Sequence, residues 1–369
     1  MKKIIIVCTQ LEAGGAQRAA IRLAKYLKKQ GYSAENWFLY KKRNVFQGVP
    51  DVKIIYPQKI DSLKDLFSFF YQLYKKMKIS DPDVVITFGH NSNIIAQFVA
   101  LLVGIKNRIA SHRNPRWGYM SKLQQVVDKI WAMAGVYHKI TAVSKSTKES
   151  FTNYPKKIYN KIIVIENGLE FNANTDLSKK EARNYFNFPD SVFLVGNVGR
   201  LSDQKNQHVL FKAISELDNN VHLAIAGEGE LREKLDEYAN KLQVSDRVHL
   251  IGEIEYDKIP IFFTSIDIFA MPSKFEGLSN ALIEAMSFSL PVICSSIDAQ
   301  KDVLINEQEV NSGILLEYDK PGDWAKTIAE LKNDTGKYLE FKEKATLRSE
   351  DFTIERMGAS FIELIEPVR

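Results

Sequence analysis

The sequence has very little cysteine, and its two cysteines are far apart. Cys8 and Cys294 are the only cysteines among 369 residues, and each lies in an apolar run typical of a strand. Buried, reduced thiols explain this pattern better than a disulfide or a metal site. We therefore exclude a disulfide-stapled fold and expect a reducing, cytoplasmic setting.

The chain also lacks a long apolar run. Its longest apolar segment, residues 94–105, contains Gln97 and is well short of the roughly 20 residues that a membrane-spanning helix needs. The basic and then apolar start of the chain superficially resembles a signal peptide, but its apolar stretch is short and leads directly into a glycine turn. A first buried strand is the better interpretation, and no transmembrane helix is predicted.

Two common cofactor signatures are missing. The dinucleotide fingerprint GxGxxG is absent after the first predicted strand, where the sequence reads EAGGAQR, and no acidic residue ends the second predicted strand, AENWFLY. A nicotinamide dehydrogenase is therefore disfavoured. His138, His208, His222 and His249 do not have the spacing of metal ligands, so we predict no metal site.

What is present is an ordinary globular composition, with 45% hydrophobic and 26% charged residues. A chain of 369 residues exceeds the size at which a single core keeps growing, so two domains are expected. The net charge of +5 is unevenly distributed. Residues 1–170 carry 28 Lys and Arg against 11 Asp and Glu, a net charge of about +17, whereas residues 171–369 carry 22 against 34, about −12. The basic half predicts an anionic partner such as phosphate-bearing lipid, a membrane surface or nucleic acid.

Apolar β-branched runs alternate with helical periodicity along the whole chain, which is the pattern of parallel sheets built from βαβ units. We predict six strands in the first half, namely IIIVCT, AENWFLY, VVITFG, RIASH, ITAVS and IIVIEN. Six more follow in the second half, namely VFLVGNV, VHLAIAG, VHLIG, IFAMPS, PVICSS and GILLEY. The fold class is therefore α/β, with two doubly wound, Rossmann-like domains joined by a polar linker near residues 168–190.

The first candidate ligand contact is the turn at Gly14 and Gly15, between the first predicted strand and a helix. Glycine permits close backbone approach, and the helix N-terminus offers unpaired N–H groups and a positive dipole end to a phosphate. A turn with only a structural role is the alternative interpretation.

In the second half, Gly199, Arg200 and Lys205 follow a predicted strand, at a spacing that lets the two cations converge on one anion. A guanidinium and an ammonium together can neutralise a departing diphosphate. Solvated surface side chains are the alternative. Gly227 and Glu228 follow the next strand, at the sheet edge where α/β folds place ligands, and an ordinary turn is again the alternative.

The most informative stretch is MPSKFEGLSNALIEAM. Glu276 precedes a predicted helix and Glu284 lies within it, with seven residues between them. Backbone amides at the start of such a helix suit a phosphate, and carboxylates accept hydrogen bonds from the hydroxyls of a sugar or ribose. The residues that lead into the helix are Gly277, Leu278, Ser279 and Asn280.

These motifs, taken in order, resemble those of the family 4 retaining glycosyltransferases of the GT-B fold. The matching segments are GG at 14–15, AVSKS at 142–146, ENG at 166–168, GRLSDQKN at 199–206, AGEGE at 226–230 and the EX7E pair at 276 and 284. The family's common GGxER turn reads GGAQR here, so Gln17 replaces an acid.

The resemblance implies a division of labour between two domains. Residues 1–170 would form an acceptor-binding domain, onto which a C-terminal helix of about residues 352–369 packs back. Residues 171–351 would bind the nucleotide sugar. Arg200 and Lys205 would then bind the donor diphosphate.

The remaining implied roles concern the sugar and the chemistry. Glu276 would contact the transferred sugar and Glu284 the ribose, with the backbone of residues 277–280 beside the sugar. Transfer would retain the anomeric configuration without a cofactor or a catalytic metal, because Arg200 and Lys205 stabilise the leaving diphosphate. The enzyme would move a hexose or N-acetylhexosamine from a nucleotide-diphosphate sugar, with UDP favoured, to a glycan or a polyprenyl-diphosphate-linked glycan in bacterial polysaccharide assembly.

Three residues in the first half are candidates for the acceptor side. His90 and His112 close the predicted strands VVITFG and RIASH, and Arg113 follows the second. Because the carboxyl ends of these strands should face the interdomain cleft, we expect contact with the acceptor or the donor sugar, and favour His112 over His90 as a catalytic group. A histidine hydrogen-bonded within a loop is the alternative for each.

The segment of residues 62–79 combines leucines and aromatics at helical spacing with Lys64, Lys75, Lys76 and Lys78. It predicts either an interfacial helix on an anionic membrane or an ordinary amphipathic helix with solvated lysines. We therefore expect a cytoplasmic protein, peripheral at the inner face of the cell membrane under the first interpretation.

Other functions fit parts of the sequence. A GT-B nucleotide-sugar epimerase or a soluble glycan synthase would use the same donor site. A nucleic-acid-binding protein would use the basic half, but no helix-turn-helix or zinc pattern is visible and Glu276 and Glu284 stay unexplained, so we expect no nucleic-acid partner. A lectin-like module would not need the cations Arg200 and Lys205.

Overall fold

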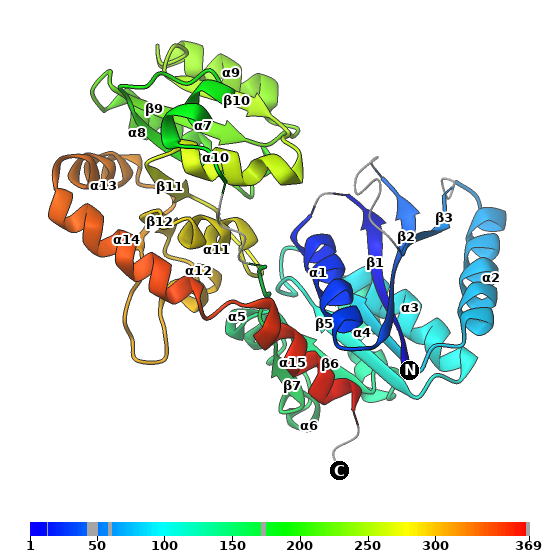
Figure 1. Cartoon of the computed structure of the whole chain (residues 1–369). Helices are drawn as coiled ribbons and strands as arrows, with labels where there is room; N and C mark the ends of the chain where they lie inside the picture. The colour runs from blue at the N-terminus through cyan, green and yellow to red at the C-terminus, as the bar shows by residue number, and fades with distance from the viewer. Residues whose placement is uncertain (13, 43–50, 58–60, 171–174, 367–369) are drawn as a thin grey trace. The chain divides into compact units, whose positions relative to one another are not determined.

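The computed structural model describes residues 1–12, 14–42, 51–57, 61–170 and 175–366. The chain divides into two compact units. The first comprises Met1–Glu170 together with Phe352–Arg369, and the second comprises Phe171–Asp351. Each unit has its own parallel sheet with helices on both faces (Figure 1).

Among the described residues, seven strands form the sheet of the first unit. They are β1 (Lys3–Leu11), β2 (Ser33–Lys41), β3 (Val52–Tyr56), β4 (Val84–Phe88), β5 (Asn107–His112), β6 (Lys139–Ala142) and β7 (Ile162–Val164). Their order is β3-β2-β1-β4-β5-β6-β7, and neighbouring strands are parallel. The order reverses between β1 and β4, which is where doubly wound sheets open a crevice for ligands.

The helices of the first unit pack on both faces of this sheet. They are α1 (Gly15–Lys29), α2 (Leu63–Ser80), α3 (His90–Val103), α4 (Lys122–Met133), α5 (Lys145–Glu149), α6 (Lys156–Tyr159) and α15 (Ile354–Ile365). Because successive strand residues point to opposite faces, Ile4 and Ile6 of β1 pack with α1 and α15, whereas Ile5 and Val7 pack with α2 and α3.

The last helix, α15, completes the core of the first unit. Phe361 is fully buried in the cluster that includes β1 and α1. At Gly358 a Cβ atom would lie 2.2 Å from the ring of Tyr26, so the absence of a side chain lets α15 approach α1 closely. Asn107 of β5 also donates hydrogen bonds to the carbonyls of Leu364 and Ile365.

The second unit contains six strands within the described residues. They are β8 (Phe193–Val198), β9 (Val221–Ala226), β10 (Val248–Gly252), β11 (Ile268–Met271), β12 (Val292–Ser295) and β13 (Ile314–Leu316). Their order is β10-β9-β8-β11-β12-β13, again all parallel, with the reversal between β8 and β11.

The helices of the second unit connect these strands. They are α7 (Lys179–Tyr185), α8 (His208–Ser215), α9 (Arg232–Lys241), α10 (Ile259–Ser265), α11 (Asn280–Ser287), α12 (Asp298–Leu304), α13 (Pro321–Asn333) and α14 (Thr335–Ser349), with a short 3₁₀ turn η1 (Tyr256–Lys258) before α10. The prediction of two doubly wound α/β domains is thus confirmed. Among the helices that the structure describes, none has the length and apolar character needed to cross a membrane.

Several helices begin at capping residues that the sequence supplies. Ser121 accepts a hydrogen bond from the backbone N–H of Gln124, whose side chain binds back to the N–H of Ser121, and this capping box starts α4. Ser178 and Glu181 start α7 in the same way. Such caps stabilise a helix by about 1 kcal/mol each and fix where it begins.

Candidate functional site

Loops that follow β8, β9 and β11 meet at the carboxyl edge of the second sheet. The loop after β8 spans residues 199–207 and the loop after β11 spans residues 272–279. Gln204 joins them twice, because its side chain donates to the carbonyl of Phe275 over 2.9 Å and its carbonyl accepts from the N–H of Lys274 over 2.8 Å. The two loops therefore form one rigid edge.

The side chains of Asn206 and Gln207 stabilise these loops through hydrogen bonds to backbone carbonyls. The sequence analysis assigned neither residue a role. Asn206 donates to the carbonyls of Pro272 at 3.0 Å and Tyr318 at 2.8 Å. Gln207 donates to the carbonyl of Arg200 at 2.9 Å. Both residues lie in the GRLSDQKNQ motif, which could have marked them as structurally important. The motif could not show which distant loops Asn206 contacts.

The loop after β9 packs backbone against backbone on the loop after β8. A Cβ atom at Gly227 would lie 1.9 Å from the carbonyl oxygen of Gly199, and one at Gly229 would lie 2.2 Å from that of Leu201. The N–H of Leu201 donates to the carbonyl of Glu228 over 3.2 Å. Both glycines are therefore needed for loop packing, whatever they do for a ligand.

Lys205 and Glu276 form an ion pair inside this edge. Lys205 Nζ lies 2.6 Å from Glu276 Oε1, and the side chains are only 19% and 8% exposed. Arg200 instead pairs with Glu230 over 3.0 Å, and both of these side chains are mostly exposed. The two cations predicted to converge on one anion are thus held by separate carboxylates.

The start of α11 brings the predicted donor residues together. Ser279 caps the helix by accepting a hydrogen bond from the N–H of Leu282. Leu278, Asn280 and Glu284 are all buried or nearly so. The predicted glycine turn, helix start and pair of glutamates are therefore one structural element at the end of β11.

The pKa of the Cys294 thiol is affected by the charge of Glu276 at this edge. Cys294 lies in β12, beside β11, and burial raises its pKa well above the usual range. The negative charge of Glu276 adds to this effect. The lone cysteine of this half is therefore a buried, protonated thiol close to Glu276.

Three buried polar side chains under the same edge were also missed. Asn197 donates to the carbonyl of Ala270 over 2.7 Å, and Gln300 to that of Met271 over 3.3 Å. Asn197 Oδ1, Gln300 Oε1 and Ser273 Oγ have no hydrogen-bond partner among the residues that the structure describes. Buried polar atoms are rarely left unpaired, so this edge is suited to a polar ligand or bound water.

In the first unit, the glycine turn is described from Gly14 onward, since residue 13 lies outside the described residues. Gly14 caps α1, and Gly15 is its first residue. A Cβ at Gly14 would lie 2.4 Å from Gln17 Oε1, and Gln17 Nε2 donates to the carbonyl of Gln10. Gln17, which departs from the family pattern, therefore packs against Gly14 and stabilises the turn by its hydrogen bond to Gln10.

A buried polar cluster links the ends of β4 and β5 to α4. His90 Nδ1 and His112 Nδ1 are 3.4 Å apart, and His112 Nε2 lies 3.8 Å from Asp128 Oδ2. Asp128 accepts a hydrogen bond from the hydroxyl of Tyr137 at 2.7 Å and another from that of Tyr154. The sequence predicted the two histidines but not the carboxylate or the tyrosines.

Burial controls protonation in this cluster. It lowers the pKa of His90 and of His112 to about 3, so both rings are neutral near pH 7. Burial also raises the pKa of Asp128, and the two tyrosine hydrogen bonds oppose that shift. His112 is 0% exposed and packs against Phe151, whereas His90 is 8% exposed. The histidine that we favoured for direct contact is thus enclosed, and His90 is the outer member.

Arg113 is an unusually buried guanidinium at the same sheet edge. It is 4% exposed and lies over the ring of Phe88 at 4.4 Å. Its Nη1 donates to Ser111 Oγ, but Nε and Nη2 have no hydrogen-bond partner within the described part of the chain. Burial lowers its pKa to about 9, which leaves it charged at neutral pH.

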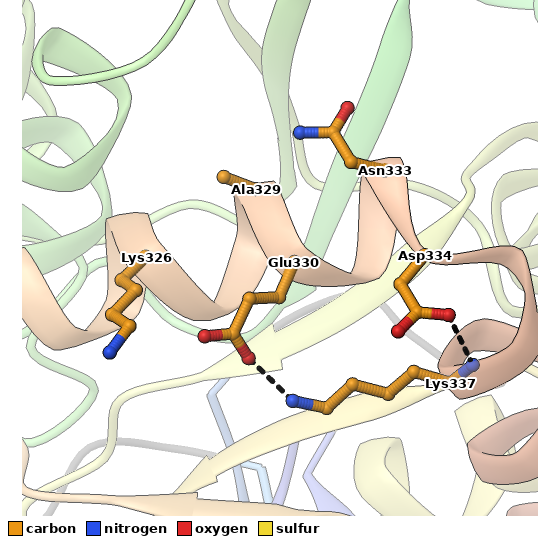
Figure 2. A pocket seen from close by; sticks show the side chains of 6 residues that line it. All are labelled: Lys326, Ala329, Glu330, Asn333, Asp334 and Lys337. Carbon is orange, nitrogen blue, oxygen red and sulfur yellow. Dashed lines mark hydrogen bonds and ion pairs between the residues drawn. The ribbon is translucent and has the colours of Figure 1, made fainter.

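A surface hollow at α13 and α14 is separate from these residues. Figure 2 shows its lining, which consists of Lys326, Ala329, Glu330, Asn333, Asp334 and Lys337. Lys337 pairs with Glu330, and its backbone N–H donates to Asp334. No residue predicted for the site lines this hollow, which is lined by two lysines and two acids.

Over the described ranges, no group of three or more His, Cys, Asp or Glu side chains is placed to hold a metal ion. His222 and His249 do contact each other, with Nδ1 and Nε2 3.1 Å apart, but they form a pair only.

Family models match nearly the entire chain. Residues 178–348 match the model described as glycosyl transferases group 1, and residues 13–172 match the one described as Glycosyltransferase Family 4. The two matches divide the chain at almost the same place as the two structural units.

Individual proteins are similar along their full lengths. An uncharacterized glycosyltransferase of Haemophilus influenzae is 27% identical over 363 residues, which cover 97% of this chain and 98% of the relative. The GalNAc-alpha-(1->4)-GalNAc-alpha-(1->3)-diNAcBac-PP-undecaprenol alpha-1,4-N-acetyl-D-galactosaminyltransferase of Campylobacter jejuni is 25% identical over 383 residues, covering 100% and 99%. The structure of Anabaena HepE in complex with UDP and glucose superposes with a TM-score of 0.86 at 18% identity, covering 98% of each chain.

Proposed function

The chain belongs to the family 4 glycosyltransferases of the GT-B fold, and on this basis we propose that it transfers a hexose or N-acetylhexosamine from a UDP-linked donor with retention at the anomeric carbon. The proposed acceptor is a glycan, carried on polyprenyl diphosphate, in bacterial polysaccharide assembly. In support, the Campylobacter relative is named for an undecaprenol-linked glycan, and Anabaena HepE binds UDP and glucose.

The observation that carries the proposal is the buried Lys205–Glu276 pair at the start of α11. An ammonium has three N–H donors, so Lys205 keeps two for a diphosphate while one binds Glu276. Glu276 Oε2 remains to accept a hydrogen bond from a sugar hydroxyl. Glu284, on the same helix, is the proposed partner of the ribose hydroxyls.

The reaction itself needs stabilisation of the leaving group. The bond from the anomeric carbon to the diphosphate breaks, the bond to the acceptor oxygen forms, and the acceptor proton passes to a phosphate oxygen. Lys205 and the backbone amides of residues 277–280 offset the charge that develops on the diphosphate. Arg200, mostly exposed and paired at the surface with Glu230, can turn toward the same phosphates.

We propose that these cations replace a catalytic metal. Transfer is then expected to proceed at an unchanged rate when EDTA is added to the assay, with added Mg²⁺ as the matched control. A loss of turnover in EDTA that Mg²⁺ restores would show that the charge on the leaving group is met by a metal ion instead.

In the first unit, His90 is the proposed contact to the acceptor or the transferred sugar. His112 and Asp128 lie behind it and set its orientation. Arg113 Nε and Nη2, which have no hydrogen-bond partner among the described residues, are the proposed donors to an acceptor phosphate.

The donor site is tested by binding. A panel of nucleotide sugars is screened for thermal stabilisation, because a ligand that binds only the folded state raises the unfolding temperature. UDP sugars should stabilise the wild type, and Lys205→Ala should lose most of that shift. Lys212→Ala is the matched control, since Lys212 forms an exposed ion pair on α8 of the same unit. Equal stabilisation of both variants would refute the assigned site.

The reaction class is tested by product analysis. Incubation of the stabilising nucleotide sugar with a glycan acceptor is followed by NMR of the anomeric proton. A glycoside with the donor's configuration is expected. A free epimer would identify an epimerase, and an inverted glycoside would contradict retention. We further propose that the enzyme works in the cytoplasm, at the inner face of the cell membrane.

A further inference from the structure

The outer side of α4 carries an exposed apolar stripe. Leu123, Val126, Ile130 and Met133 are 49% to 73% exposed and follow one another at steps of three and four residues, so they share one side of the helix. The opposite side of α4 buries Ala132 in the core. A helix with apolar residues on both its buried and its exposed sides is unusual in a protein surrounded by water.

The stripe continues onto the two neighbouring helices. The rings of Phe98 in α3 and Trp131 in α4 stack at 5.0 Å, which joins these helices, and Leu102 of α3 is exposed beside them. On α2, which packs against α3, Phe67 and Tyr71 are exposed one turn apart. The outward sides of α2, α3 and α4 together are called the α2–α4 face.

The charges around the α2–α4 face are almost all positive. The three helices carry six lysines, of which Lys76 donates to the backbone carbonyl of Ile55 in β3. The other five are Lys64, Lys75, Lys78, Lys122 and Lys129. Their two acids point elsewhere, because Asp65 binds Ser62 at the start of α2 and Asp128 is buried. The first unit as a whole has 30 Lys and Arg against 14 Asp and Glu, a net charge of about +16.

We propose that the α2–α4 face docks on an anionic lipid bilayer, with α4 as its main inserted element. Apolar side chains ringed by lysines match the boundary between acyl chains and acidic head groups. A second copy of the chain would bring the same positive charges against each other and is therefore a poorer partner. This docking surface would bring the enzyme to its acceptor, and only the identity of that acceptor rests on the proposed function.

Docking in this way would orient the first unit. The helices α2, α3 and α4 each begin at the carboxyl edge of the parallel sheet, where His90 and Arg113 lie, and run back to its amino edge. Helices lying flat in the interface sink about 5–10 Å into the head-group boundary. The carboxyl edge would then sit at the depth of lipid phosphates, where a diphosphate-linked acceptor presents its glycan.

The experiment is sedimentation of the full-length protein with vesicles, without substrates. Vesicles of mixed phosphatidylcholine and phosphatidylglycerol should pellet the wild type at low salt, and pure phosphatidylcholine vesicles should pellet far less. The variant Leu123→Gln/Ile130→Gln should lower the partition coefficient by about tenfold or more, because each side chain loses transfer into the apolar phase. Glutamine keeps the helix propensity of α4.

The matched control is Leu339→Gln/Leu347→Gln. These leucines are similarly exposed on α14, in the acidic unit, and should leave vesicle binding unchanged. Equal binding of Leu123→Gln/Ile130→Gln and the wild type would overturn the proposal. So would a concentration-dependent dimer, seen by light scattering, that this variant abolishes while vesicles pellet neither protein. Turnover with a lipid-free glycan acceptor should be unchanged in both variants, so failed docking and failed transferase activity remain distinguishable.

Discussion

At the scale of single residues, the Lys205–Glu276 pair affects both the stability of the fold and the proposed reaction. Both side chains are largely removed from water, so each depends on the other for charge balance. Removing one partner of a buried pair leaves an uncompensated charge, which costs more than the pair itself contributes. The pair is therefore held in place before a diphosphate arrives.

Replacing Lys205 by Met is expected to lower kcat by about 10²–10³-fold, because one preorganised cation at the leaving group is lost. Glu276→Gln should also lower kcat but retain UDP affinity, since Glu276 is assigned to the sugar. Steady-state kinetics and UDP titration measure both effects. If Lys205→Met kept the wild-type kcat, the leaving group would be stabilised by other residues.

The enclosed histidines predict a pH dependence of folding. Their pKa is about 3 in the folded state against 6.5 when unfolded, so the unfolded chain binds more protons between these values. Stability present above pH 6.5 is therefore lost as the pH falls, by at most about 2 kcal/mol per histidine at pH 5. Asp128 acts in the opposite direction, because its raised pKa favours the folded state at lower pH. We expect the two histidines to set the sign of the net slope between pH 7 and pH 5.

Urea unfolding at pH 7 and pH 5 measures this slope. His112→Gln, a neutral replacement, should flatten it clearly, whereas His138→Gln should change it much less, because His138 is exposed and its pKa is lowered without reaching the value of the enclosed rings. If His112→Gln kept the wild-type dependence of stability on pH, the group that titrates would not be His112.

Single residues also mark the limit of what the sequence could predict. His90 and His112 were found from their positions after strands, but strand position says nothing of depth, and the ring of Phe151 that encloses His112 comes from a distant segment. The separation of Arg200 from Lys205 likewise depends on Glu230 and Glu276, which belong to other loops. Spacing along the chain could not reveal which carboxylate each cation meets.

At the scale of elements, the second sheet depends on loops that pack without side chains. Gly227→Ala would place a Cβ against the carbonyl of Gly199, so the loops after β8 and β9 must separate. We expect a loss of about 1–3 kcal/mol in stability and weaker UDP binding. The control Gly322→Ala meets only an ordinary contact at 3.6 Å and lies in α13, so it should not destabilise the protein. Thermal unfolding with and without UDP measures both. Unchanged unfolding of Gly227→Ala would show that the loops adjust freely.

Elements were predicted well where their pattern was strong. All six strands of the second unit and six of the first were identified from apolar runs, whereas β3, VKIIY, was missed. It is short, lies at the sheet edge and contains the solvated Lys53, so its apolar signal is weak. The stripe on α4 was missed for another reason, because periodicity shows that a side is apolar but not whether anything covers it.

At the scale of the whole molecule, the first unit is built from two distant parts of the chain. Phe361 of α15 is fully buried against β1 and α1, so Phe361→Ala should destabilise the first unit by about 3–5 kcal/mol. The exposed Glu363→Ala on the same helix is the control. Hydrogen exchange should accelerate in β1 and β4 but not in β8 and β9. Equal acceleration in both sheets would mean that the units unfold together.

The return of α15 also has a consequence during translation. A ribosome synthesises β1 and α1 first, yet the apolar surface that they share with α15 stays open until the second unit has been made. The second unit, contiguous in sequence, can fold on emerging, while the first waits with part of its core unfilled. The nascent chain is thus most prone to aggregate through its earliest segment, and chaperones should bind there until residues 354–365 leave the exit tunnel.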